Sequence, residues 1–108
     1  MKKLNINPQV YDDLKEIREY ISKDSLEQAK KVVRKIYEDI LSLSENPERG
    51  ANLKNKVKQK TKYKYILTFK HYATLYYVTE EAVFVTLVLH TAKDLSALRL
   101  IEPDTDEK

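Results

Sequence analysis

The chain has 108 residues, of which 42% are apolar and 34% charged, and its formal net charge is +3. This length suits one domain with a single core and is too short for two domains that fold alone. The sequence contains no cysteine and only two histidines, which excludes disulfides, a thiol nucleophile and a zinc–thiolate site, so we expect no metal or other cofactor.

The N-terminal stretch MKKLNINPQV contains a short strand candidate, Lys3 to Ile6, followed by a helix start. Asn7 can cap a helix, and Pro8 suits the first helical position because the N–H that it lacks would be unpaired there. No apolar run follows the two lysines, as a signal peptide would require, and no segment approaches the roughly 18 apolar residues of a membrane span. We therefore expect a cytoplasmic protein.

Two amphipathic helices are predicted next. The first follows Pro8, and the second runs from Ser25 to about Ser44, where Ser25 and Gln28 have the form of a capping box. The apolar positions recur every three or four residues, which places them on one face of each helix. They are Val10, Leu14, Ile17 and Ile21 in the first helix and Leu26, Ala29, Val33, Ile36, Ile40 and Leu43 in the second. The short SKDS connection makes the helices an antiparallel hairpin, which ENPERG terminates.

After the hairpin, lysine occupies every second position of NLKNKVKQKTKYKY. We call this set the lysine strip: Lys54, Lys56, Lys58, Lys60, Lys62 and Lys64. No acidic residue lies between Arg49 and His71, whereas the rest of the chain, with 12 basic and 17 acidic residues, carries a net charge of −5. Charged edge strands and loops also prevent unwanted strand pairing, but they do not require six uncompensated lysines. The strip is interpreted as an anion-binding surface for nucleic acid or an acidic protein segment.

Three strands are predicted beyond the strip. Alternation from Tyr63 to Phe69 indicates the first, Tyr72 to Val78 forms the second, and Val83 to His90 is apolar enough for a central strand buried on both faces. Tight connections at Lys70-His71 and Thr79 to Ala82 predict an antiparallel meander. From Asp94, DLSALRLI is expected to form one or two helical turns.

The predicted fold class is α+β, with a helical hairpin packed on one face of a small antiparallel sheet in the order β-α-α-β-β-β-α. We expect a single domain over residues 1–101 and a disordered acidic tail over residues 102–108. The tyrosines of the predicted strands are expected to pack between sheet and helices, with one or two exposed at most.

Several segments together resemble one family. They are the hairpin DDLKEIREYISKDSLEQAKKVVRKIYEDILSLSENPERG, closing in Leu-x-x-x-Pro-x-x-Gly form at Leu43, Pro47 and Gly50, then YKYILTFKHYATLYYV and VFVTLVLHTAKDL. In order and spacing they resemble the RelE/ParE superfamily of toxins from bacterial type II toxin–antitoxin modules, over roughly Leu4 to Leu100. The resemblance implies a growth-inhibiting toxin that is neutralised by a cognate antitoxin wrapping over its helices and sheet.

The superfamily has two mechanistic branches. One resembles a ribosome-dependent endonuclease that cleaves messenger RNA, and the other resembles a poison of DNA gyrase that performs no chemistry. The nuclease pattern is kept at the Tyr63-Lys64 pair and at Lys93, but Ile66 stands where that branch has a lysine and Ala73 where it has an arginine. An alanine cannot stabilise the phosphate charge that RNA cleavage builds up.

His90 is the remaining candidate for a catalytic residue, because an imidazole titrates near neutral pH and suits acid or base catalysis. Its place in VLHTAKD resembles the ParE-like branch, and we expect a structural role with a ring nitrogen bonded to backbone. His71 is expected only to be solvated in a turn. The sequence thus predicts a ParE-like toxin that binds gyrase. The alternatives are a ribosome-dependent ribonuclease using Lys64, His90 and Lys93, and an inactive homologue that only binds its antitoxin.

Overall fold

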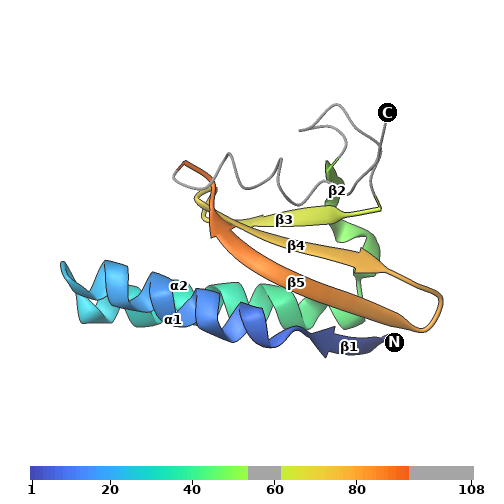
Figure 1. Cartoon of the computed structure of the whole chain (residues 1–108), viewed down its shortest axis with the longest axis horizontal. Helices are drawn as coiled ribbons and strands as arrows, with labels where there is room; N and C mark the ends of the chain where they lie inside the picture. The colour runs from blue at the N-terminus through green and yellow to red at the C-terminus, as the bar shows by residue number, and fades with distance from the viewer. Residues whose placement is uncertain (54–61, 93–108) are drawn as a thin grey trace.

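The computed structural model describes residues 1–53 and 62–92 of the chain. Its elements are β1 (Lys3–Ile6), α1 (Pro8–Ser22), α2 (Leu26–Leu41), the 3₁₀ turns η1 (Ser42–Ser44) and η2 (Pro47–Arg49), β2 (Ala51–Asn52), β3 (Lys64–Thr68), β4 (Tyr72–Val78) and β5 (Ala82–His90). The helical hairpin lies along one side of the sheet (Figure 1), so the predicted α+β class is confirmed. The helical turns predicted from Asp94 and the acidic tail lie outside the described residues. Within those residues, no helix is both long and apolar enough to span a membrane.

Both helices begin where the sequence predicts, because a polar side chain caps each one. The Asn7 side chain accepts a hydrogen bond from the Gln9 N–H at 2.8 Å, and the Ser25 hydroxyl accepts one from the Gln28 N–H at 3.1 Å. Each bond satisfies one of the N–H groups that the first turn of a helix leaves without a partner. After Leu41 the second helix tightens into η1, so helical structure ends at Ser44 as predicted.

The main core lies between the hairpin and the sheet. It consists of Val10, Leu14, Val32, Ile36, Ile40 and Leu43 from the helical side and Ile66, Tyr72, Tyr76, Val83, Val85 and Val88 from the strands. A smaller cluster of Leu53, Ala73, Leu75 and Leu89 lies on the face of the sheet that the helices do not cover. The sheet therefore buries apolar side chains on both faces.

The predicted apolar stripe of α2 is wrong at two positions. Val32, rather than Val33, fills the core position between Ala29 and Ile36. Both valines lie three or four residues from these neighbours, so it is the orientation of α2 on the sheet that buries Val32. Val33 lies at the margin of the core and Leu26 is 49% exposed. Part of the apolar surface of α2 thus faces away from the sheet.

The sheet has the strand order β1-β5-β4-β3-β2. Strands β3, β4 and β5 form the predicted antiparallel meander, but β1 pairs in parallel with β5, with Lys3 opposite Ala82 and Ile6 opposite Val85. The sheet is therefore mixed, and the expectation of a purely antiparallel sheet is wrong at this strand. Alternation in a strand indicates which side chains share a face, not which neighbour pairs with it or in which direction.

Strand β4, rather than β5, is the most buried. It occupies the middle of the sheet, and Tyr72 to Tyr76 are all buried. Strand β5 has neighbours on both sides, but Phe84, Thr86, Leu87 and His90 are only half-buried. The prediction of a strand buried on both faces was made for β5 but fits β4. The tyrosines of β4 make its sequence look more polar than that of a buried strand. A fifth strand, β2, pairs Ala51 and Asn52 with Tyr65 and Lys64, and two residues are too few to produce a pattern.

The turn between β3 and β4 adopts an unusual backbone conformation. Phe69 and Lys70 have φ angles of 55° and 65°, and the His71 N–H donates to the Thr68 carbonyl at 3.2 Å. Two consecutive positive φ angles define a type I′ hairpin turn, which normally contains Asn and Gly. The predicted tight connection is present, centred one residue before the expected Lys70-His71 pair.

The Leu-x-x-x-Pro-x-x-Gly motif connects the end of the hairpin to the sheet. Leu43 is fully buried, and the Tyr76 hydroxyl donates to the Pro47 carbonyl at 2.8 Å while accepting from the Gly50 N–H at 2.9 Å. A Cβ atom on Gly50 would lie 2.4 Å from the same hydroxyl. Only glycine fits this approach, so the motif has a structural role.

Candidate functional site

Most of the predicted anion-binding surface falls outside the described residues, since Lys54, Lys56, Lys58 and Lys60 lie there. The two lysines that are described have partners. Lys64 Nζ lies 3.3 Å from a carboxylate oxygen of Glu48 and donates to the Asn52 side chain at 3.4 Å. Lys62 Nζ lies 4.0 Å from the centre of the Tyr77 ring, within range of a cation–π interaction. The end of the strip is thus fixed to the edge of the sheet.

A row of aromatic rings adjoins Lys62 on the sheet face without helices. Tyr63 meets Tyr77 edge to face with ring centres 5.5 Å apart, and Tyr77 stacks on Phe84 at 5.1 Å. Burial, and then the neighbouring Tyr77, raise the pKa of the Tyr63 hydroxyl. Among the strand tyrosines, Tyr72 and Tyr76 are buried in the core between sheet and helices, as predicted. Tyr63, Tyr65 and Tyr77 are half-buried on the other face, so the prediction that most of these tyrosines pack between sheet and helices is wrong. None is fully exposed.

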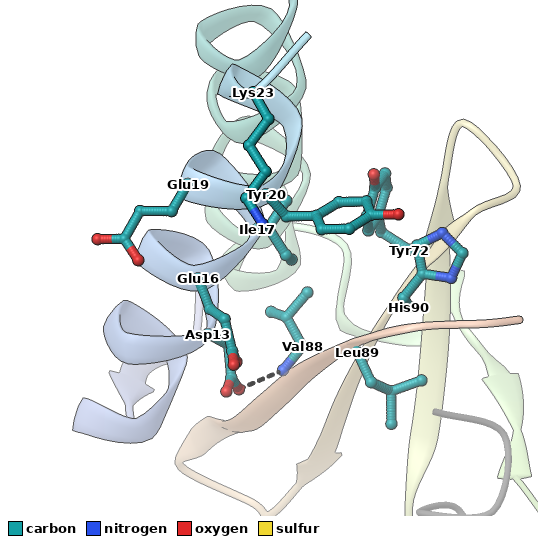
Figure 2. A pocket seen from close by; sticks show the side chains of 10 residues that line it. All are labelled: Asp13, Glu16, Ile17, Glu19, Tyr20, Lys23, Tyr72, Val88, Leu89 and His90. Atoms are coloured by element: carbon teal, nitrogen blue, oxygen red, sulfur yellow. Dashed lines mark hydrogen bonds between the residues drawn. The ribbon is translucent and has the colours of Figure 1, made fainter. Parts of the chain in front are cut away.

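His90 lies at a pocket of about 330 Å³ between α1 and the ends of β4 and β5. Figure 2 shows its two walls. Helix α1 contributes Asp13, Glu16, Ile17, Glu19, Tyr20 and Lys23, and the strands contribute Tyr72, Val88, Leu89 and His90. The pocket is therefore rich in carboxylates on one wall and in aromatic rings on the other.

The His90 ring is held by backbone and by other rings. Its Nδ1 atom accepts a hydrogen bond from the Ala92 N–H at 3.1 Å, which leaves the ring proton of the neutral form on Nε2. The ring stands perpendicular to Tyr72 at 5.3 Å and stacks on His71 at 6.3 Å. These contacts agree with the structural role expected for His90, whereas His71, although exposed, has a ring partner that the sequence did not indicate.

Lys64 and His90, two of the three candidate residues of the ribonuclease alternative, do not meet in the described structure. Lys64 is opposite Tyr76 on β4, whereas His90 is opposite Tyr72, four residues further along the same strand. Four residues of strand span about 13 Å, so the two side chains lie at opposite ends of the sheet. Lys93 lies outside the described residues.

The two positions that depart from the nuclease pattern lie inside the protein. Ile66 packs in the main core and is 4% exposed, and Ala73 packs beside Leu75 and Leu89 in the smaller cluster and is also 4% exposed. A lysine or arginine head group at either place would have to leave the core to reach a phosphate.

Two carboxylates have roles that sequence reasoning missed. The Asp13 carboxylate accepts a hydrogen bond from the Val88 N–H at 2.9 Å, on the stretch of β5 that extends beyond its pairing with β1. Asp39, 6% exposed, accepts from the Thr68 hydroxyl at 2.7 Å and lies 3.2 Å from Lys35 Nζ. The place of Asp39 between Ile36 and Ile40, on the apolar face of α2, could have indicated its buried role from the sequence. No sequence pattern indicated the role of Asp13.

The described residues, 1–53 and 62–92, contain no group of three histidine or acidic side chains placed to hold a metal ion. The rim at Lys62 and Lys64 and the His90 pocket offer charge, hydrogen bonds and aromatic faces to a partner.

Comparison with known proteins gives a consistent result. Residues 4–95 match the family model described as the ParE toxin of the type II toxin–antitoxin system parDE. A solved structure titled "Chromosomal ParDE TA system from P. aeruginosa" superimposes with a TM-score of 0.68 at 18% identity, covering 83% of this chain and 96% of the other. A search of curated protein sequences finds no match. Because the family match extends over nearly the whole hairpin and sheet, this chain belongs to the ParE toxin family of type II toxin–antitoxin systems.

Proposed function

We propose that this toxin inhibits growth by binding and poisoning DNA gyrase in the bacterial cytoplasm, without chemistry of its own, whenever its antitoxin is absent. Family membership supports the toxin role and a cognate antitoxin as partner. The choice of gyrase over messenger RNA rests on how the nuclease pattern is distributed in the fold.

The observation that carries this choice is the burial of Ala73. RNA cleavage by the 2′-hydroxyl needs a base, an acid and a positive charge, all within reach of the same phosphodiester group. At Ala73 the fold provides an apolar cluster instead of a cation, and Lys64 and His90 lie at opposite ends of the sheet. A binding mechanism needs no such convergence.

Two assays with the same protein test the proposal. Gyrase, supercoiled plasmid and ATP are incubated with the full chain from cell-free synthesis, and trapped double-strand breaks are released with detergent and protease. In parallel, a reconstituted translation reaction is examined for cleaved messenger RNA. We expect linear plasmid from the first assay, intact messages from the second, and suppression of the breaks by the cognate antitoxin.

The opposite pattern, cleaved messages with intact plasmid, would replace gyrase by the ribosome as the target. In that case Lys64→Ala and Lys93→Ala should abolish cleavage while leaving antitoxin binding intact. If neither assay responds and cells expressing the chain alone grow normally, the protein is an inactive member of the family that retains only its antitoxin-binding role.

A further inference from the structure

The smaller apolar cluster of the sheet has no described element above it. Its members, Leu53, Ala73, Leu75 and Leu89, lie on the face of the sheet that the helices do not cover (Figure 1). Leu53 and Leu75 are nevertheless fully buried, and the other two are 4% and 5% exposed. In the described part of the chain both helices pack on the opposite face, so they do not account for this burial.

A neighbouring position on the same face shows the exposure of a side chain without a cover. Leu67 of β3 lies directly opposite Ala73 of β4, so the two side chains share this face of the sheet. Leu67 is 44% exposed. Tyr65 and Leu87 pack against the cluster, but they flank Leu75 on the adjoining strands and so lie beside it in the same layer. The cluster is therefore covered, whereas the sheet next to it is open.

The cover belongs to the chain itself, because the cluster is buried within a single copy of it. Two stretches, 54–61 and 93–108, lie outside the described residues, and their compositions differ. Residues 54–61, KNKVKQKT, contain one apolar side chain and four lysines, and the acidic end EPDTDEK contains no large apolar side chain. Residues 94–101, DLSALRLI, contain Leu95, Ala97, Leu98, Leu100 and Ile101. Only this stretch has enough apolar surface to exclude water from the cluster.

The pattern and the reach of this stretch both suit the cluster. In the helical turns predicted from Asp94, Leu95, Leu98 and Ile101 follow at spacings of three, which places them on one face. Eight residues span about 12 Å as a helix and about 26 Å when extended, and the three strand spacings from β5 to β2 measure about 14 Å. The stretch begins five residues after Leu89, which is itself a member of the cluster.

The chain is held to the sheet almost up to the start of this stretch. The Thr91 N–H donates to the His71 carbonyl at 2.8 Å, and the Ala92 N–H donates to His90 Nδ1 at 3.1 Å. Residues 94–101 thus begin two residues beyond a fixed backbone. Because the tether is short, little loop-closure entropy is lost when they are held over the sheet.

We propose that residues 94–101 of this chain cover the smaller cluster and shield it, in the free protein, from water and from other chains. Leu95, Leu98 and Ile101 supply the apolar surface that closes it. Without them the cluster would join the exposed Leu67 in a continuous apolar patch, and such patches promote association between proteins. The proposal does not depend on gyrase as the target.

Cross-linking tests where this stretch lies. The chain has no cysteine, so two introduced cysteines react only with each other. Leu98→Cys is combined with Leu67→Cys on the helix-free face or, as the control, with Leu41→Cys on α2, since Leu67 and Leu41 are both 44% exposed. With a short bismaleimide, we expect the Leu67 pair to be linked within one chain at least about fivefold more than the Leu41 pair, because docking gives its thiols a high effective concentration.

Substitutions test what the stretch does. Leu95→Ser with Leu98→Ser in the full chain should raise the fluorescence of the apolar dye ANS at least about threefold and produce larger species in size-exclusion chromatography, because apolar surface becomes exposed. Leu26→Ser with Leu41→Ser, the same change at leucines that are already exposed on α2, should do neither. Circular dichroism checks that the hairpin remains folded in both variants.

Three results would overturn the proposal. Equal linking of position 98 to positions 67 and 41 would show that the stretch does not dock on the helix-free face. Links between two chains instead of within one would show that a second copy covers the cluster. Unchanged dye fluorescence and unchanged size for Leu95→Ser with Leu98→Ser would show that the cluster is shielded by something other than residues 94–101.

Discussion

At the residue scale, the only glycine of the chain lies against the Tyr76 hydroxyl. Gly50→Ala should cost about 1–3 kcal/mol of unfolding free energy, because a Cβ there would lie 2.4 Å from the hydroxyl oxygen and 2.7 Å from the Tyr65 carbonyl. Urea unfolding followed by circular dichroism measures the loss. Tyr76→Phe removes one of the crowded atoms, so Gly50→Ala should cost less in that background than in the wild type. Equal costs would show that the hydroxyl does not impose the requirement for glycine.

A second prediction at this scale concerns the turn at Phe69 and Lys70. Phe69→Asn with Lys70→Gly should stabilise the fold by about 1 kcal/mol, because Asn and Gly adopt the positive φ angles of a type I′ turn more readily than Phe and Lys. The midpoint of thermal unfolding should rise. The matched control is Glu80→Asn with Glu81→Gly in the turn between β4 and β5, where φ is not positive. A gain of the same size at both turns would contradict the explanation.

At the element scale, the lysine strip remains a predicted anion-binding surface. Replacing Lys54, Lys56 and Lys58 with glutamine should weaken binding to the target or the antitoxin and reduce the salt dependence of the affinity. Fewer lysines would then pair with anionic groups of the partner, so fewer counterions would be released on binding. Affinity measured over a range of salt concentrations checks both effects. Glutamine at Lys2, Lys3 and Lys31 removes the same charge elsewhere and should change the salt dependence less. If affinity depends on salt concentration equally in the two triple variants, the lysine strip does not bind anions and serves only solubility.

The helices also show which features a single sequence can determine. Their starts at Asn7 and Ser25 depend on a hydrogen bond across three residues or fewer, which the local sequence contains in full. The orientation of α2 depends instead on how the sheet meets it, so Val32 is buried where the periodicity equally allowed Val33. The same limitation applies to the Asp13 hydrogen bond, which joins residues 75 positions apart.

At the scale of the whole molecule, β1 and the core join the two ends of the described structure into one unit. We expect unfolding to be a single cooperative transition, in which the midpoints from far-ultraviolet circular dichroism and from tyrosine fluorescence coincide. Ile6→Ala, which removes part of a core side chain on β1, should lower both midpoints equally by the equivalent of about 1–2 kcal/mol. Asn5→Ala, exposed on the opposite face of the same strand, is the control. Separate midpoints would indicate that the hairpin and the sheet unfold independently.

The overall arrangement was predictable to the extent that it depends on patterns within elements. Helix pairing, the meander and the α+β class depend on periodicity and short connections, and all three are confirmed. The parallel position of β1 was not predictable, because residues 3–6 contain no information about residues 82–85. The candidate site was harder still, since Lys64 and His90 are both candidates for the ribonuclease alternative but lie at opposite ends of the sheet.

The pairing of β1 with β5 also has a consequence for synthesis of the protein. Strand β1 obtains its hydrogen-bonding partner only when residues 82–85 leave the ribosome. Contacts so distant in sequence form late and slowly. The hairpin and the strands before β5 are therefore synthesised while β1 still lacks its partner, and the five-stranded sheet closes only after β5 has been made.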